Sequence, residues 1–333
     1  MVRIVVVVST VLGVACLAGP AGQGARPGES YVVAVPLGLD IAAPVPADNP
    51  LREPAIELGR TLFFDPVLSA DTSLSCASCH QPARYFTDGR ERAVGIDGRE
   101  GTRNVPSVLN VAYGRSFFWD GRVGSLEEQI LEPIRGRNEL GLDTAELGPR
   151  LRPRGSYPAA FGAAFGDEAI TSDRVARAIA SYLRTLRSGN APIDRFLHGD
   201  TSALSPDARR GFRLFTGRAN CGVCHTIPLF TDHQFHNTGV SWGSRDTGRL
   251  AVTGEEADRG LFRTPSLRNV GETAPYMHDG SLRTLEEVIE HYDRGGTRNR
   301  NLDEEIRPLG LTPAEKRQIV AFLEALTEGP SDR

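Results

Sequence analysis

Cysteine, methionine and lysine are scarce in this sequence of 333 residues, which has five cysteines, two methionines and a single lysine, Lys316. The basic residues are therefore nearly all arginine, and 38 basic against 42 acidic side chains leave a formal net charge of −4. This charge argues against nucleic acid as the main partner, because a phosphate backbone is bound by a basic face. After residue 18 no apolar run approaches the length of about 20 residues that crosses a bilayer, so we expect no stable membrane insertion.

The N-terminus has the pattern of an export signal. Arg3 is followed by an apolar run at 4–18 and then by small residues, which is the order of a secretory signal peptide. We therefore expect a signal peptide at 1–25, a flexible leader at 26–50 rich in glycine, proline and alanine, and a periplasmic mature protein. Cys16 leaves a lipid anchor open as an alternative, although the residues before it form a poor lipobox.

Two C-x-x-C-H motifs account for the four remaining cysteines: Cys76, Cys79 and His80 form the first, and Cys221, Cys224 and His225 form the second. This is the attachment sequence of c-type haem. Two thiols three positions apart reach the two vinyl groups of one porphyrin, and the adjacent histidine binds the iron as its proximal ligand. The sequence thus predicts two covalent haem c groups.

Other uses of four cysteines fit the spacing poorly. An exported protein often pairs its cysteines in disulfides, but the repeated motif favours haem. A structural zinc site typically has its two C-x-x-C pairs about 15–20 residues apart, whereas here the second pair follows the first by more than a hundred residues. A thioredoxin-like dithiol would occur once, within a βαβ pattern that this sequence lacks.

The chain also contains an internal duplication, and its length exceeds the roughly 100–200 residues of one domain. Several residues recur exactly 159 positions later, among them Pro106 as Pro265, Asp120 as Asp279, and Leu126 as Leu285. Apolar residues at helical spacing close each half, with Ile179, Leu183 and Leu186 in the first and Ile319, Leu323 and Leu326 in the second. We predict an all-α, loop-rich fold of two duplicated cytochrome c-like domains, at 51–195 and 196–330, each with one covalent haem.

The two halves differ in what they offer as a sixth iron ligand. Beyond Met1 the only methionine is Met277, and no histidine occurs between His80 and His198. The first half therefore has no second histidine of its own for a bis-histidine haem. Because the sixth ligand separates electron transfer from chemistry, we expect a five-coordinate first iron that is open to a small ligand.

From about residue 50 onward the chain resembles the bacterial di-haem cytochrome c peroxidase family. The resemblance is carried by stretches beside both haem motifs: Arg103-Asn104-Val105-Pro106, Phe118-Trp119-Asp120-Gly121 and Pro275-Tyr276-Met277-His278-Asp279-Gly280. It is greatest to the MauG branch, named for methylamine utilisation. Typical members ligate the second iron with a methionine where this chain has Tyr292, and cap the resting first iron with a histidine where it has Ile96.

The resemblance and the repeat agree on the second iron. The position that matches Tyr292 in the first half is Pro133, whose ring has no donor atom. Tyr292 is thus the expected ligand of the second iron, with His233 and His236 as rival candidates. A phenolate is a hard anionic donor that favours higher iron oxidation states, as the tyrosine ligand of catalase does.

The resemblance also implies roles for further residues. Glu139 would move protons during cleavage of the peroxide O–O bond, Gln129 would be a hydrogen-bonding neighbour in that pocket, and Trp119 would relay electrons between the haems. One calcium ion would lie between the domains. Its expected ligands, which offer hard oxygen donors, are Asn104 and the backbones of Thr273 and Pro275.

We therefore expect a periplasmic enzyme that reduces hydrogen peroxide at the open haem of the N-terminal domain. Electrons would arrive from a small cytochrome c or cupredoxin through the electron-transfer haem of the C-terminal domain. One alternative is MauG-type oxidation of side chains on a partner protein through a high-valent di-haem state. Another is a non-catalytic electron carrier, in which both haems would be six-coordinate.

Overall fold

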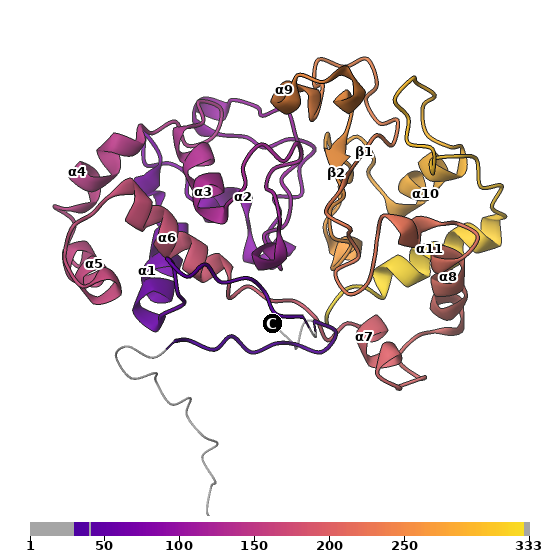
Figure 1. Cartoon of the computed structure of the whole chain (residues 1–333), viewed down its shortest axis with the longest axis horizontal. Coiled ribbons are helices and arrows are strands. Elements are labelled where there is room, and N and C mark those ends of the chain that lie inside the picture. The colour runs from indigo at the N-terminus through magenta and orange to yellow at the C-terminus, as the bar shows by residue number, and fades with distance from the viewer. Residues whose placement is uncertain (1–29, 40, 330–333) are drawn as a thin grey trace, which may run out of the picture.

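The computed structural model describes residues 30–39 and 41–329, so the expected signal peptide lies outside the described residues. Two helical lobes lie side by side, the first running from indigo to magenta and the second from orange to yellow (Figure 1). In this part of the chain the only strands are β1 (Phe235–His236) and β2 (Phe262–Arg263), which pair antiparallel. The predicted all-α, loop-rich fold is confirmed as a mostly helical, loop-rich structure in which these two short strands form the one sheet of the described residues. None of the described helices has the length and hydrophobicity needed to span a membrane.

The first lobe is built around two crossing helices, α1 (Glu53–Phe64) and α6 (Ser172–Leu183). Around this pair lie α2 (Cys76–Cys79), α3 (Leu126–Arg135), α4 (Leu147–Leu151) and α5 (Tyr157–Phe165). Their apolar faces meet in one core, which includes the fully buried Leu62, Ile134 and Phe161.

The second lobe repeats this plan with α8 (Pro206–Thr216) crossing α11 (Pro313–Glu324). The lobe also contains α7 (Pro192–Leu197), α9 (Leu250–Thr253) and α10 (Leu285–Asp293). Its separate core holds Phe215, Phe230 and Phe322. Helix α11 begins at a capping box, in which the Thr312 hydroxyl accepts from the Glu315 amide and the Glu315 carboxylate accepts from the Thr312 amide.

Short 3-10 helices fill the long connections of both lobes. They are η1 (Pro66–Leu68), η2 (Pro82–Arg84), η3 (Ile96–Gly98), η4 (Val111–Tyr113), η5 (Thr144–Glu146), η6 (Cys221–Val223), η7 (Glu256–Asp258) and η8 (Val270–Glu272).

One glycine in each lobe explains why the duplicated helices cross so closely. A Cβ atom at Gly59 of α1 would lie 1.8 Å from the carbonyl oxygen of Ala178 in α6. A Cβ atom at Gly211 of α8 would lie 1.8 Å from the carbonyl oxygen of Gln318 in α11. Any larger side chain would force the helices apart, so the repeated glycine sets the same crossing in both lobes.

The leader is packed onto both lobes at one point. Leu39 is fully buried and contacts Tyr113 of the first lobe and Leu229 of the second. The Leu37 amide donates to the Asn190 side chain over 2.9 Å. Residues 36–39 are thus held in place, which differs from the flexible leader expected there, whereas Val32 remains exposed.

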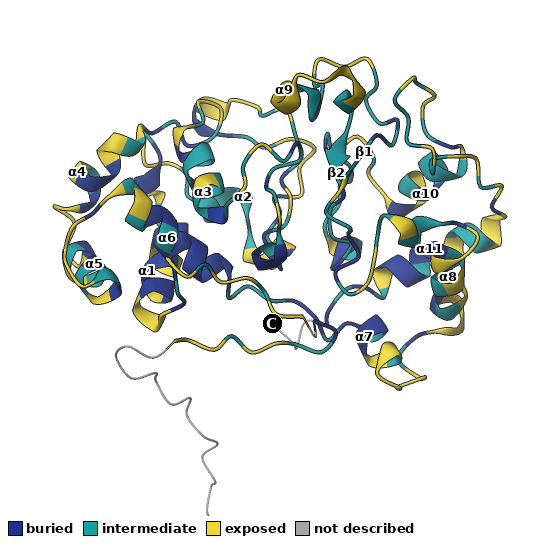
Figure 2. Cartoon of the chain, viewed as in Figure 1, coloured by how far each residue is buried: buried dark blue, intermediate teal, exposed yellow. Residues whose placement is uncertain are grey.

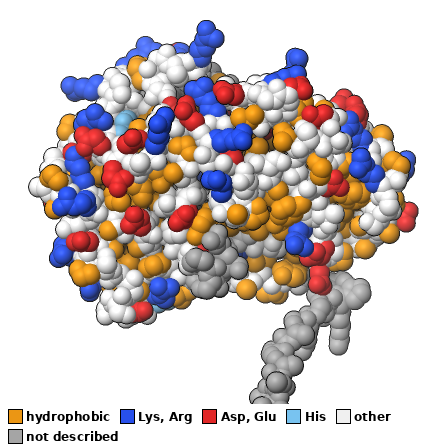
Figure 3. All heavy atoms as spheres, turned by 180° about the vertical axis from the view of Figure 1, so that it is seen from behind, with side chains coloured by type: hydrophobic (Ala, Val, Ile, Leu, Met, Phe, Trp, Pro, Cys, Tyr) orange, Lys and Arg blue, Asp and Glu red, His pale blue; other side chains and the backbone are white. Residues whose placement is uncertain are grey.

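Burial and charge follow the usual division between interior and surface. The buried residues lie inside each lobe and along the segment that connects the lobes (Figure 2). Seen from behind, acidic and basic side chains are interspersed with apolar ones (Figure 3). This face therefore carries no broad field of one sign.

Candidate functional site

The first haem motif begins on a single capped helical turn. Helix α2 carries Cys76 and Cys79, and its capping box joins Ser75 to Ser78, so a residue between the cysteines fixes the start of the turn. His80 follows as the C-cap, and its amide donates to the Cys76 carbonyl oxygen over 2.9 Å. The turn therefore places two thiols and one imidazole on a rigid piece of backbone.

The two proximal histidines are oriented in the same way. The His80 ring donates from Nδ1 to the Phe86 carbonyl oxygen over 3.1 Å, and the His225 ring donates from Nδ1 to the Phe230 carbonyl oxygen over 2.8 Å. A carbonyl oxygen only accepts, so Nδ1 carries the proton and Nε2 is left to bind a metal. Burial lowers the pKa of both imidazoles, which favours the neutral form that a metal ligand requires.

All four motif cysteines are free thiols, so the described residues contain no disulfide between them. Burial raises the pKa of Cys76 to about 12, of Cys79 to about 11 and of Cys221 to about 12. These are protonated thiols in apolar surroundings. Such thiols suit thioether attachment better than metal–thiolate binding, which needs the deprotonated sulfur.

The second motif opens onto a cavity of about 300 Å³ at the boundary of the lobes. Cys221, Cys224, His225 and Tyr292 all line it. Burial raises the pKa of the Tyr292 phenol, and the neighbouring Cys221 and Cys224 thiols raise it further. Tyr292 therefore shares one pocket with the haem-attachment residues, and its role as an iron ligand stays a prediction.

The chemistry of this cavity fits a haem. Among the described residues, the buried atoms without a hydrogen-bond partner include His233 Nδ1 and His278 Nε2, and both residues line the cavity. Arg263 also lines it, and burial lowers the pKa of its guanidinium. Unpaired donors and a buried cation need acceptors, and the two carboxylates of a porphyrin would supply them.

His236 is poorly placed to be an iron ligand. Its Nε2 lies 2.9 Å from Asp232 and its Nδ1 lies 2.6 Å from Asp303, so both ring nitrogens are engaged. Cys224 and the two aspartates raise the pKa of His236 to about 10. Both ring nitrogens of His236 therefore face carboxylates, which makes it a weaker candidate ligand than His233 or Tyr292.

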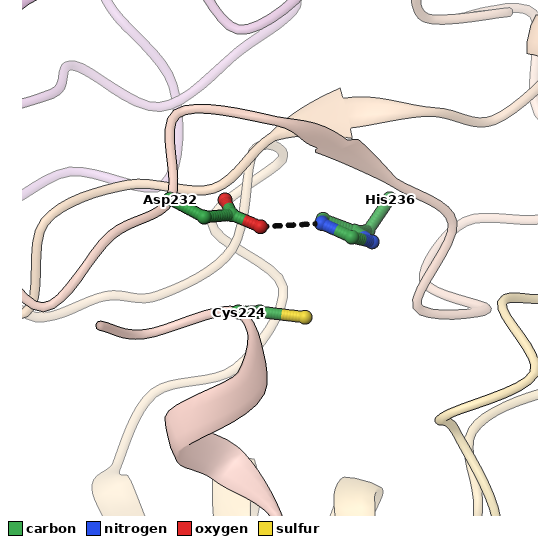
Figure 4. A group of neighbouring side chains, drawn as sticks. All are labelled: Cys224, Asp232 and His236. Carbon is green, nitrogen blue, oxygen red and sulfur yellow. Dashed lines mark hydrogen bonds and ion pairs between the residues drawn. The ribbon is translucent and has the colours of Figure 1, made fainter.

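Cys224, Asp232 and His236 converge as a group that resembles a metal site (Figure 4). The ligand atoms lie within 4.8 Å of one another. The sulfur of Cys224, however, belongs to the C-x-x-C-H motif and would be consumed by a thioether bond to haem. With the haem attached, only the two-residue pair of Asp232 and His236 remains.

Helices α3 and α10 are the two copies of one duplicated helix, and they differ at the position predicted to provide an iron ligand. Pro133 lies inside α3 at the position that Tyr292 occupies in α10. Gln129 lies one helical turn before Pro133 on the same face and is half-buried. Helix α3 thus has a proline ring where α10 has a phenol.

Glu139 follows α3 and lies near the first haem motif. Burial raises the pKa of its carboxyl group, with Arg122 opposing the shift and Glu132 adding to it. Its charge in turn raises the pKa values of Cys76 and Cys79, so the carboxyl group lies within electrostatic range of the attachment thiols.

The loop that carries Ile96 is fastened to this region. The Ile96 amide donates to the Glu139 carbonyl oxygen over 2.9 Å, and the Ile96 side chain is buried. An apolar side chain therefore lies packed beside Glu139, at the place where the resemblance led us to compare it with an iron-capping histidine.

Trp119 is held between the lobes by bonds to both. Its Nε1 donates to the Asn104 carbonyl oxygen over 3.0 Å, and its own carbonyl oxygen accepts from the Arg263 amide over 2.7 Å. Its ring centroid lies 6.5 Å from that of His278, which stacks on Phe262 at 3.5 Å. Trp119 also lines the haem cavity of the second lobe, and its role as an electron relay stays a prediction.

The expected calcium ligands lie in the same region. The Asn104 side chain donates from Nδ2 to the Arg90 carbonyl oxygen over 2.8 Å, so its Oδ1 is the atom left for a cation. Asn104 and Thr273 line the same cavity. The assignment of Asn104, Thr273 and Pro275 to calcium stays a prediction.

The sequence did not predict one ion pair that joins the lobes, between Arg103 and Asp246. Arg103 binds Asp246 through Nε at 2.7 Å and Nη2 at 2.8 Å, and binds Asp120 through Nη1 at 2.7 Å. Arg103 and Asp120 both stand in stretches that drew attention in the sequence. Asp246 carried no such signal, because its partner lies 143 residues away.

Fold and site together define a class: a mostly helical, duplicated protein whose two C-x-x-C-H motifs would each hold one haem of the c type. Comparison with known proteins then gives the family. The chain belongs to the di-haem cytochrome c peroxidase family, whose model matches residues 53–202, and it is accordingly an oxidoreductase.

Relatives match most of the chain. Methylamine utilization protein MauG of Methylorubrum extorquens is 44% identical over 87% of this chain and 83% of its own length. Cytochrome c551 peroxidase of Nitrosomonas europaea is 36% identical over 87% of this chain and 84% of its own. The crystal structure of a MauG-like protein associated with microbial copper homeostasis is similar with a TM-score of 0.82 and 34% identity, covering 91% of this chain and 96% of that one.

Proposed function

We propose that this protein is a periplasmic peroxidase that reduces hydrogen peroxide in the haem pocket of the first lobe and takes its electrons from a small protein donor through the second lobe. The observation that carries the proposal is the difference between Pro133 and Tyr292 at matching positions of α3 and α10. Proline at this position offers the iron of the first lobe no ligand atom, so one coordination site of that iron would stay open. The phenol oxygen of Tyr292 would instead occupy the matching coordination site of the second iron. Catalysis in one lobe and electron transfer in the other follow from that difference.

The chain's own residues would hold both cofactors. Cys76 and Cys79 would attach one haem and Cys221 and Cys224 the other, with His80 and His225 as proximal ligands. When bound, haem supplies iron that binds peroxide and exchanges electrons. The carbonyl oxygens that accept from Nδ1 of both histidines fix the rings and increase their basicity as ligands.

Glu139 would carry the proton transfers in the first pocket. Cleavage of peroxide moves one proton from the near oxygen to the leaving oxygen, and a positioned carboxyl group does this best when its pKa approaches the working pH. Burial shifts the pKa of Glu139 in that direction. Gln129, one turn before Pro133, would help to orient the bound peroxide.

Trp119 would connect the two pockets. Its indole is an oxidisable ring whose N–H donates to the Asn104 carbonyl oxygen, and its backbone is held by the Arg263 amide, so the ring need not reorganise when an electron passes. A calcium ion held by Asn104, Thr273 and Pro275 would brace the same seam between the lobes, because hard cations take oxygen ligands.

Oxidation of side chains on a partner protein is the second candidate, and Tyr292 is the observation that favours it. A buried phenol as second iron ligand favours retention of oxidising equivalents over rapid reduction by a donor. The 44% identity to methylamine utilization protein MauG points in the same direction.

Reaction of the holoprotein with peroxide and reduced cytochrome c tests the proposal. We expect cyanide to bind one ferric haem per molecule and reduced cytochrome c to support rapid steady-state turnover. Slow turnover with a long-lived oxidised state would favour the second candidate instead. Two six-coordinate haems that bind neither cyanide nor peroxide would leave only an electron carrier.

Glu139→Gln sharpens the test. We expect it to slow peroxide cleavage by about 10²–10⁴-fold, the contribution typical of a general acid–base group, while cyanide still binds one haem. Glu168→Gln, which changes an exposed acid of the same lobe, is the matched control and should leave the rate unchanged. Equal rates for both variants would remove Glu139 from the mechanism.

A further inference from the structure

A second, smaller cavity lies in the second lobe, near its boundary with the first lobe. Its volume is about 140 Å³, and its lining includes Trp242, Phe262, Ser244, Thr247, Asp246 and Arg259. Strand β2, which carries Phe262, stands at the edge of the second lobe that faces the first (Figure 1). None of these residues except Phe262 lines the haem cavity.

One wall of this cavity is in contact with the rings that lead to Trp119. Phe262 stacks on His278 with ring centroids 3.5 Å apart and planes inclined by 14°. His278 in turn lies 6.5 Å from Trp119, measured between ring centroids. An unbroken series of rings therefore runs from the cavity wall to the tryptophan between the lobes.

A second wall is tied to the same tryptophan through the backbone. Asp246 accepts two hydrogen bonds from Arg103. Asn104, which follows Arg103 in the sequence, provides the carbonyl oxygen that accepts from the Trp119 indole. The cavity and Trp119 are thus fixed relative to each other by an ion pair across the seam.

Trp242 is half-buried in this cavity and is, with Trp119, one of the two tryptophans of the chain. The backbone at Gly260 (φ +78°) approaches it so closely that a Cβ atom there would lie 3.3 Å from the indole ring. Within the described part of the chain no protein atom accepts a hydrogen bond from its indole N–H. The ring is therefore held by packing while its N–H stays free for a ligand.

We propose that this cavity binds a neutral single-ring phenol as a second reductant, and that Trp242 passes the electron of the phenol toward Trp119. This inference rests on the proposed peroxidase function. Each phenol loses one electron and its hydroxyl proton to become a phenoxyl radical. Two phenols thus supply the two electrons and two protons that convert one hydrogen peroxide into two waters.

Size and lining select this class of ligand. An apolar cavity of about 150 Å³ accommodates one benzene ring, and this cavity is of comparable volume. Trp242 and Phe262 offer aromatic surfaces, against which another ring packs in an offset or edge-on arrangement. Ser244 and Thr247 supply hydroxyl groups for the phenol oxygen. Asp246 and Arg259 contribute opposite charges, so the lining favours a neutral ligand over an ion.

Two variants of the holoprotein separate binding from electron transfer, with 4-methylphenol as the probe. Trp242→Phe keeps an aromatic wall but removes the oxidisable indole, so kcat for peroxide-dependent phenol oxidation should fall about tenfold or more with little change in KM. Ser244→Trp puts a bulky side chain at an exposed position of the cavity lining, so the dissociation constant measured by calorimetry without peroxide should rise about tenfold. Ser202→Trp, at an exposed serine outside the cavity, is the matched control and should change neither quantity.

Reduced cytochrome c, assayed in parallel, separates the two proposals. Loss of phenol oxidation in Trp242→Phe with cytochrome c turnover retained supports the inference. Cytochrome c turnover without phenol oxidation in the unmodified protein, or phenol oxidation and binding unaffected by both variants, overturns the inference alone. Failure of peroxide turnover with either donor overturns the proposed function and the inference with it.

Discussion

Asp194 and Arg268 form a buried ion pair in which the two carboxylate oxygens accept from two guanidinium nitrogens, each at 2.9 Å. The same guanidinium donates to the carbonyl oxygens of Gly38 and Pro228. Asp194 lies in α7, Gly38 in the leader and Pro228 in the loop after the second haem motif. One side chain therefore ties three distant segments together beside the haem pocket.

Asp194→Asn should destabilise the holoprotein strongly. Its loss of charge leaves Arg268 buried without a counter-ion, and breaking a buried pair in this way costs about 3–5 kcal/mol of the free energy of unfolding. Urea denaturation followed by circular dichroism measures the change. Asp207→Asn breaks an exposed pair with Arg210 and should cost about 0–1 kcal/mol. Similar losses in both variants would contradict the role assigned to Asp194.

The parts of the fold that could be predicted from the sequence are those fixed by local chemistry. Helix α11 could be predicted because Ile319 and Leu323 recur at helical spacing within a few residues of each other. The duplication was visible because Pro106, Asp120 and Leu126 each recur 159 positions later. Long-range pairs have no such local signature, and Asp194 and Arg268 are 74 residues apart in the sequence.

The same distinction between local and long-range features applies to the residues of the site. The haem motifs were readable because Cys76, Cys79 and His80 carry their chemistry within five residues. The place of Glu139 beside the thiols depends on how the chain after α3 folds back, so it came from family resemblance. The stacking of Phe262 on His278 and the cavity beside Trp242 arise only from the tertiary fold.

Tyr292→Phe should open the second iron. Removing the phenol oxygen deletes the proposed ligand but keeps the ring that fills the pocket, so ferric protein should bind two cyanides per molecule in place of one. Optical titration counts them. Tyr276→Phe is the control, because Tyr276 lines the same cavity while its hydroxyl donates to the Val270 carbonyl oxygen. A single cyanide in both variants would transfer the ligand role to His233.

Calcium should stabilise the protein through the seam between the lobes. Because a ligand that binds only the folded state raises stability by mass action, the melting temperature should rise with millimolar calcium and fall with a chelator. Asn104→Ala should abolish both responses. Asn138→Ala, at an exposed asparagine of the first lobe, should retain them. A melting temperature indifferent to calcium in the unmodified protein would rule out the site.

The raised pKa of Glu139 gives stability a definite dependence on pH. Because burial raises this pKa above its usual value of 4.5, the folded state holds the proton more tightly than the unfolded state does. Stability from this group is therefore fully present below pH 4.5 and is lost as pH rises through the folded-state pKa. Glu139→Gln removes this titrating group. The free energy of unfolding of the variant, relative to that of the unmodified protein, should therefore increase from pH 4 to pH 8. Urea midpoints across this range measure the difference, with Glu168→Gln as the reference. A difference that shrinks with rising pH would mean that Glu139 is stabilised as the carboxylate, and would exclude it as a group that retains its proton in the pocket.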